Sequence, residues 1–237
     1  MIEVYITNLG KYVEGELCGE YLKLPAEKSD VQALLARIGV DGVIYEETFI
    51  TDYESEIDNL CRYMGEYESI DELNLLATRL TEMEYFDVEK FIAAIEYGDY
   101  SDSVKKLINL THNLENYEFI PDVKDRDDLG RYFVDEMGML EVPENLQNYF
   151  DYEAYGRDID YDTNGVFSSD LGGYIYNNHG RFIEHYSDRD DIPDDIKIFA
   201  YPDPPEKMPI KEQLEMFGKM ITEPLKGKLT PALDERA

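Results

Sequence analysis

Residues 2–7, Ile-Glu-Val-Tyr-Ile-Thr, alternate apolar and polar side chains and predict the first strand of the chain. A turn region over residues 8–15 leads to a second predicted strand, residues 16–24. Residues 43–51 again have strand-like content. These segments provide the strands of a small N-terminal unit.

A helix separates the second and third of these strands. Ser29 to Gln32 fits a capping box, in which side chains satisfy backbone N–H groups of the first turn. Gly39 is a helix stop. The apolar residues between these signals recur at helical spacing, at Val31, Leu34, Leu35 and Ile38. Strands and helix together predict an α+β domain over residues 1–64.

Residues 65–112 predict a helical middle domain. Ser69 to Glu72 fits a second capping box, which opens a helix. A second helix opens at Asp87 and ends at Gly98, and a third opens at Ser101. The apolar residues of the first helix are Leu73, Leu76, Leu80 and Met83.

Residues 113–186 predict a second α+β domain. Asp125 or Asp127 caps one helix, and Pro143 suits the start of another that runs through Phe150. Residues 173–186 predict a hairpin that turns at Asn177-Asn178-His179-Gly180. The predicted fold class is therefore α+β, with three small domains.

Residues 187–237 predict a C-terminal extension. Closely spaced prolines from Pro193 to Pro209 are typical of an extended linker. Residues 210–222 then predict an amphipathic helix. The extension could dock on the body, continue its acidic surface or bind another molecule.

The chain is strongly acidic, with 53 Asp and Glu against 22 Lys and Arg and a net charge of -31. Its 20 Tyr and 10 Phe predict a folded protein, because disordered acidic chains have few aromatic residues. Solubility needs a net charge of only roughly 2–8. The excess charge therefore favours a role in attracting a basic cleft, such as that of a DNA-binding protein.

Most of this charge lies in residues 1–186, whose net charge is -27. Two copies of that segment would carry as much charge as roughly 90 Å of duplex DNA, which has one charge per ~1.7 Å. The chain has no basic stripe for nucleic-acid binding, no apolar run that could span a membrane, and no signal-peptide pattern. Its two cysteines, Cys18 and Cys61, are predicted to be reduced, which favours a cytoplasmic protein.

Catalytic motifs give no specific signal, because carboxylate pairs arise by chance among so many acids. The three histidines, His112, His179 and His185, lack zinc-ligand spacing. Asp160, Asp162, Asn164 and Gly165 match the first half of a calcium loop, but its last position is Leu171 where the loop requires Glu. The alternative interpretation is an Asn-Gly turn that joins two strands. No catalytic residue, cofactor or metal is predicted.

A longer motif is far more specific. Residues 146–160 read Leu-Gln-Asn-Tyr-Phe-Asp-Tyr-Glu-Ala-Tyr-Gly-Arg-Asp-Ile-Asp and closely resemble the antirestriction motif of the ArdA family. Val4-Tyr5-Ile6, Asn8 to Tyr12, Glu14 to Leu17 and Asn178-His179-Gly180 resemble the same family. The similarity covers residues 1–186, with an insertion at residues 163–173.

The resemblance implies an elongated three-domain α+β protein that dimerises through its third domain and has a surface like bent double-stranded DNA. It implies inhibition of Type I restriction-modification enzymes through their methyltransferase and specificity subunits, without catalysis or cofactors. The alternatives are an acidic protein that sequesters a nucleoid protein or another defence factor, and a carboxylate hydrolase.

The partner-binding residues are expected in the third domain. The predicted DNA-mimic acids are Asp122, Asp125, Asp127, Asp128, Asp135, Glu136, Glu141, Glu144, Asp151, Glu153, Asp158 and Asp160. Core or dimer contacts are expected from the motif residues Leu146, Tyr149, Phe150, Tyr152 and Tyr155, and Arg157 is expected to pair with a nearby acid.

Overall fold

A computed structural model describes residues 2–57 and 59–203 of the chain. Contacts group Met1–Pro202 into one unit and Asp203–Ala237 into another. The first unit contains helices and two small antiparallel sheets, which confirms the α+β class. The amphipathic helix predicted over residues 210–222 lies outside the described residues.

The first sheet has the order β2-β1-β3, and both pairings are antiparallel. Ile2, Val4 and Ile6 alternate along β1 and are almost fully buried, as the period of two predicts. Helix α2 contributes four apolar residues to the same core. The elements in chain order are β1 (Ile2–Asn8), α1 (Leu9–Val13), β2 (Gly19–Leu24), α2 (Lys28–Ile38), β3 (Thr48–Ser55) and the 3-10 turn η1 (Leu60–Tyr63).

Two local predictions in this part are wrong. The expected turn region after β1 contains helix α1, whose first turn is capped by the Asn8 side chain accepting from the Lys11 N–H at 3.0 Å. The capping box of α2 is formed by Glu27 and Asp30, so the helix begins earlier than predicted. Gly39 ends α2 in a left-handed conformation, with φ of 77°, as expected.

The three helices of the middle part are confirmed, and the first begins after Ser69 as predicted, whereas the second and third begin at other residues than those predicted. Ser103, not Ser101, caps the third helix by accepting from the Lys106 N–H. Ser69 precedes the first helix, but its hydroxyl has no hydrogen-bond partner within the described residues. The helices are α3 (Ile70–Glu82), α4 (Tyr85–Tyr97) and α5 (Val104–Leu110), followed by the 3-10 turn η2 (Leu114–Asn116).

The second sheet has the order β4-β6-β5 and contacts α4. The predicted hairpin over residues 173–186 is wrong, because β6 pairs with β4 and β5 and its predicted partner is not a strand. Strand β4 was not predicted from its sequence. The strands are β4 (Tyr117–Pro121), β5 (Val166–Ser168) and β6 (Gly173–Asn177).

Residues 122–165 connect β4 to β5 and are called the helical insertion below. The helix predicted from Pro143 is only a 3-10 helix, and a longer helix that was not predicted covers most of the motif. Ile120, Val123, Leu129 and Tyr174 form a second small core beneath it. The elements are α6 (Arg126–Arg131), the π-helical turn η3 (Tyr132–Glu136), η4 (Glu144–Tyr149) and α7 (Tyr152–Thr163).

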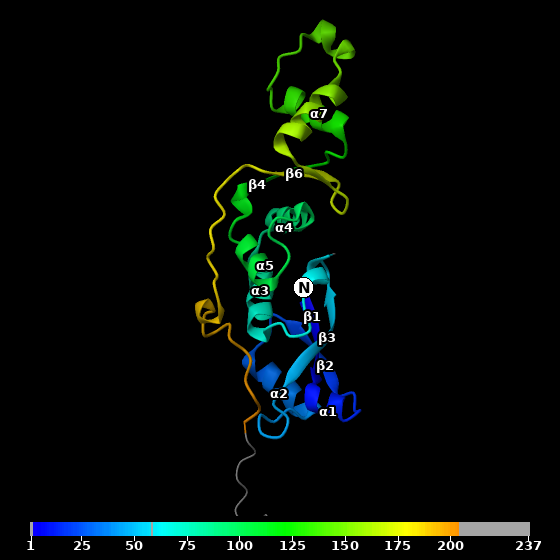
Figure 1. Cartoon of the computed structure of the whole chain (residues 1–237). Helices are drawn as coiled ribbons and strands as arrows, with labels where there is room; N and C mark the ends of the chain where they lie inside the picture. The colour runs from blue at the N-terminus through cyan, green and yellow to red at the C-terminus, as the bar shows by residue number, and fades with distance from the viewer. Residues whose placement is uncertain (1, 58, 204–237) are drawn as a thin grey trace, which may run out of the picture. The chain divides into compact units, whose positions relative to one another are not determined.

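Residues 178–202, called the strap below, run beside α5 and α3 toward α2 (Figure 1, yellow to orange). Their regular structure is limited to the 3-10 turn η5 (Arg189–Asp191). Ile192 and Ile198 are each only 2% exposed and belong to the main core. Up to residue 202 the C-terminal extension therefore docks on the body, which is one of the alternatives that the sequence left open.

Candidate functional surface

The motif helix α7 packs against α6 with almost no side chain between the two backbones. A Cβ added at Gly156 would lie 1.8 Å from the Arg126 carbonyl oxygen, and one added at Gly130 would lie 2.0 Å from the Tyr152 carbonyl oxygen. Only glycine fits such an approach. Gly156 of the motif and Gly130, which the sequence did not single out, therefore set the position of the acids on both helices.

An ion pair joins the same two helices. The Arg126 guanidinium donates from Nε and Nη2 to Asp160 Oδ2 at 3.0 and 2.9 Å. Tyr174 Oη donates to Asp160 Oδ1 at 3.1 Å. Burial raises the pKa of Tyr174 to about 12, so this phenol is protonated at neutral pH.

The calcium-loop candidate lies in this region and does not form a loop. Asp160 and Asp162 lie within α7, and Asn164 ends that helix in a left-handed conformation with φ of 50°. The Asn-Gly pair leads from a helix into β5, so the alternative of a turn between two strands is also wrong. Within the described ranges no cluster of His, Cys, Asp or Glu is arranged to hold a metal ion.

The motif aromatics divide into buried and exposed side chains. Tyr152 is 6% exposed, donates its hydroxyl to Asp135 and lies 4.3 Å below the Arg131 guanidinium. Burial and the Asp135 carboxylate raise the pKa of Tyr152. Phe150 packs edge-on against Tyr152 and Tyr155. Tyr149, in contrast, is 84% exposed.

Several of the predicted mimic acids have local structural partners. Asp125 and Asp151 cap α6 and α7 by accepting from backbone N–H groups. Asp127 pairs with Arg131 at 2.6 Å, and Asp128 accepts from the Lys124 N–H. Arg157 pairs with Asp158 at 3.6 Å, which confirms the expected pairing of this arginine. These carboxylates are held in place but are partly neutralised or shielded.

The remaining acids of the set are more available. Five of them are exposed and have no ion-pair or hydrogen-bond partner among the described residues: Asp122, Glu136, Glu141, Glu144 and Glu153. They lie on the turn after β4, at the end of η3, beside η4 and at the start of α7. The helical insertion therefore carries a group of solvated negative charges.

Exposed apolar side chains lie in the same insertion, between η3 and α7. Met137, Met139 and Leu146 are 55%, 64% and 50% exposed, and Tyr149 follows them. The segment also borders a hollow of about 610 Å³ lined by Val134, Leu140, Val142 and other residues. Apolar surface gathered in this way marks an interaction site more often than single exposed residues do.

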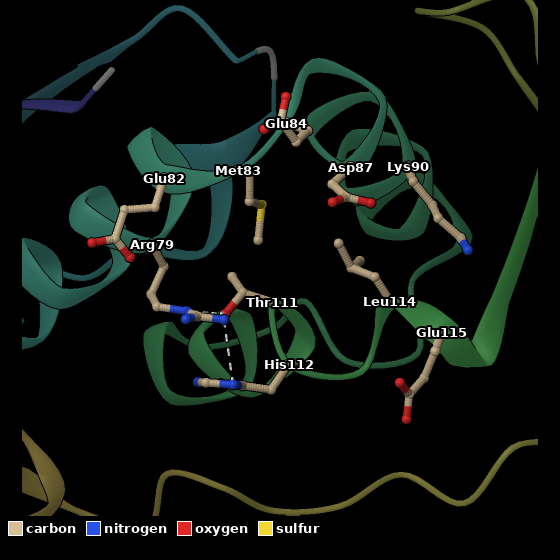
Figure 2. A pocket seen from close by; sticks show the side chains of 10 residues that line it. All are labelled: Arg79, Glu82, Met83, Glu84, Asp87, Lys90, Thr111, His112, Leu114 and Glu115. Carbon is tan, nitrogen blue, oxygen red and sulfur yellow. Dashed lines mark hydrogen bonds between the residues drawn. The ribbon is translucent and has the colours of Figure 1, made fainter.

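A separate pocket of about 530 Å³ lies among α3, α4 and η2 (Figure 2). Figure 2 shows Met83 and Leu114 pointing into it, with Arg79 near Thr111 and His112 on one side and Lys90 on the other. Its lining mixes basic side chains with Glu82, Glu84, Asp87 and Glu115. None of the predicted site residues lines this pocket.

A comparison with models of protein families assigns the chain to a family. The model of the ArdA antirestriction proteins matches residues 4–176, from β1 to β6. The chain belongs to the ArdA family. No curated protein matches it. The ArdA match ends before Asn178-His179-Gly180 and before the strap, so it is shorter than the similarity expected over residues 1–186.

Membership of the ArdA family makes the chain an antirestriction protein that acts against restriction-modification systems. The match includes the α6–α7 crossing, the five available acids and the exposed apolar segment. No helix within residues 2–57 and 59–203 is long and apolar enough to cross a membrane.

Proposed function

We propose that this ArdA protein inhibits Type I restriction-modification enzymes by occupying their DNA-binding groove. Carboxylates would take the place of phosphates and pair with the Lys and Arg residues of the methyltransferase and specificity subunits. Carboxylates present no base edges, so inhibition would not depend on the recognition sequence of the enzyme. The group of exposed, unpaired acids on the helical insertion is the observation that supports this function.

The protein would act as a homodimer through the third predicted domain, residues 113–186. The apolar segment from Met137 to Tyr149 supports an interface there, because these side chains are exposed in the single chain. Light scattering of the full chain tests the dimer. Leu146→Glu together with Tyr149→Glu should give monomers, whereas a dimer that survives both changes uses another surface.

The inhibition is tested by competition between the purified full chain and labelled duplex DNA for a Type I enzyme. Added salt should weaken the competition, because both ligands bind through ionic contacts. A parallel capture experiment with a nucleoid protein tests the alternative of a different basic partner. If the chain binds the nucleoid protein and does not displace DNA from the Type I enzyme, the proposed target is refuted.

A charge-matched pair of variants tests the position of the acids. The first variant neutralises six exposed acids of the insertion to Asn or Gln: Asp122, Glu136, Glu141, Glu144, Glu153 and Asp158. The control neutralises six exposed acids outside it: Glu16, Glu46, Glu47, Glu66, Glu82 and Glu84. At roughly 0.2–1 kcal/mol per exposed pair, the first variant should need about tenfold or more protein for half inhibition.

The control variant should lose less inhibitory activity, because the proposed contact is centred on the helical insertion. Equal losses would mean that total charge, and not its placement on the helical insertion, determines inhibition. Unchanged inhibition by both variants would refute the mimic itself. A single Asp-to-Asn change that abolished activity would instead support a carboxylate hydrolase.

A further inference from the structure

Two asparagines, one in α5 and one in the turn after it, hold the strap through its backbone. Asn113 donates from Nδ2 to the Ile183 carbonyl and accepts at Oδ1 from the Ile183 N–H, both at 2.8 Å. Asn109 accepts from the N–H groups of His185 and Tyr186 at 2.7 and 2.9 Å and donates to the Tyr186 carbonyl at 2.7 Å. Both asparagines are 2% exposed. Their amides satisfy the extended backbone as a neighbouring strand would.

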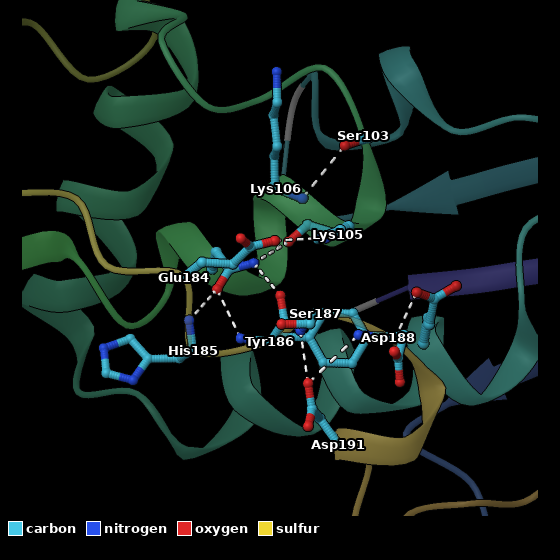
Figure 3. A network of polar contacts seen from close by, with 11 residues as sticks. Ser103, Lys105, Lys106, Glu184, His185, Tyr186, Ser187, Asp188 and Asp191 are labelled. Carbon is cyan, nitrogen blue, oxygen red and sulfur yellow. Dashed lines mark hydrogen bonds and ion pairs between the residues drawn. The ribbon is translucent and has the colours of Figure 1, made fainter.

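Side-chain contacts reinforce this part of the strap. Tyr186 is buried and donates its hydroxyl to Glu72 of α3 at 2.6 Å. Glu184 pairs with Lys105 of α5 at 2.5 Å, and Figure 3 shows both beside the backbone of His185 and Tyr186. The strap is therefore fastened to two helices at once.

A buried carboxylate holds the next part. Asp71 of α3 is 2% exposed and accepts at Oδ1 from the N–H groups of Ile198 and Phe199, at 2.8 and 2.7 Å. Its Oδ2 accepts from Arg189 Nη2 at 2.5 Å. All of these partners belong to the strap. Release of the strap would break one ion pair and two charge-assisted hydrogen bonds at this carboxylate, which is unfavourable.

The end of the strap reaches the first predicted domain. The Tyr201 hydroxyl donates to the Glu46 carbonyl at 3.0 Å, and Gln32 of α2 donates to the Tyr201 carbonyl at 2.9 Å. The ring covers Gly42, where an added Cβ would lie 2.6 Å from its Cγ. The strap thus contacts elements of the first and middle predicted domains after leaving β6 of the third.

We propose that the strap is an intramolecular clamp that fixes these elements in one arrangement, with Asp71, Asn109 and Asn113 as positioning residues for inhibition. The proposal rests on the proposed function, because an array of charges competes with DNA only when its spacing is fixed. The clamp lies beyond residue 176, where the ArdA match ends, so it is an addition to the matched region.

A pair of variants separates clamping from charge. Ile192→Glu with Ile198→Glu places two charges in buried anchor positions and should release the strap. Ile183→Glu with Ser187→Glu adds the same charge at exposed strap positions. A mimic that depends on charge alone would be strengthened equally by both. The clamp predicts that the first variant needs about tenfold more protein for half inhibition, and the second does not.

Hydrogen exchange of the full chain gives a readout that is independent of the enzyme. The first variant should exchange at least about tenfold faster at the backbone N–H groups of position 198, Phe199 and residues 28–47, while its helix content stays constant. Arg189→Ala is a milder change at an exposed side chain and should accelerate exchange at Ile198 and Phe199 only.

Faster exchange with undiminished inhibition by the first variant would overturn the clamp. Unchanged exchange in both the first variant and Arg189→Ala would also overturn it. If the first variant fails to fold, unchanged exchange in Arg189→Ala would overturn it. Failure of the unmodified chain to displace DNA would refute the proposed function, while the exchange experiment would still test the clamp.

Discussion

Replacing Gly156 by Ala tests whether the crossing of α6 and α7 holds the motif in place. The added Cβ would lie 1.8 Å from the Arg126 carbonyl oxygen and 2.7 Å from the Gly130 nitrogen. Carbon and oxygen approach to roughly 3.3 Å without strain. Both neighbouring atoms are backbone, so the helices must separate by roughly 1.5 Å.

The cost follows from two opposing effects. Overpacking of this kind destabilises by roughly 1–3 kcal/mol, and the separation also loosens Leu129 and Tyr152, which are buried at the crossing. Alanine regains up to about 1 kcal/mol because it favours the helix more than glycine does. We expect a net loss of about 2 kcal/mol in the free energy of unfolding, measured by urea denaturation of the full chain.

Gly65→Ala is the matched control. Its added Cβ would have only the Glu68 Oε1 atom near it, at 3.4 Å, and the stability should change by less than about 0.5 kcal/mol. Gly130→Ala should resemble Gly156→Ala, and the double variant should lose less than the sum, because both changes open the same contact. A Gly156→Ala chain as stable as the control would refute the close crossing.

Three further outcomes are expected. Because burial raises the pKa of Tyr174 to about 12, its protonated phenol stabilises the fold fully below pH 10, and this contribution is lost as the pH rises through 12. Between about pH 9 and pH 11.5, the free energy of unfolding of Tyr174→Phe, measured in urea titrations, should therefore fall by roughly 2 kcal/mol less than that of the unmodified chain. Arg126→Met should lower the free energy of unfolding by roughly 1–3 kcal/mol, because its partner Asp160 is only 13% exposed. Arg157→Met should lower the same free energy by less than about 0.5 kcal/mol, because its partner Asp158 is exposed. Burial raises the pKa of the Cys61 thiol, so a thiol reagent at about pH 8 should modify it more slowly in the folded chain than in urea, and equal rates would contradict its burial.

The sequence predicted those elements whose signals are local. Helix α2 was found because its four apolar residues share one face and Gly39 adopts the left-handed conformation that ends it. Strand β4 and the pairing of β6 were missed because the partners are more than fifty residues apart, so no turn signal connects them. The strap was missed for a related reason. Its backbone bonds go to side chains of α3 and α5, and hydrophobic periodicity does not report such bonds.

The candidate surface was predicted as a set of residues, but not their individual roles. The family resemblance located these acids in the third predicted domain, whereas their exposure depends on how α6 and α7 cross. Asp160 is paired with Arg126, which is 34 positions away in sequence, and is therefore not a solvated charge. Glu153 stays exposed only one turn from the buried Gly156. Spacing along the chain could not distinguish these two acids.

The proposed DNA-mimic array of carboxylates must be held against its own repulsion. Two exposed charges roughly 10 Å apart repel by about 0.4 kcal/mol in water, and a net charge of -31 multiplies such pairs. The glycine crossing and the buried strap contacts would offset this cost. In about 0.5 M NaCl the screening length falls to about 4 Å, so the free energy of unfolding should rise while the inhibition of a Type I enzyme falls. The six-acid variant of the insertion should show smaller changes in both. A chain whose stability and inhibition change in the same direction with salt would contradict the model, because repulsion within the array and attraction to a basic groove are screened together.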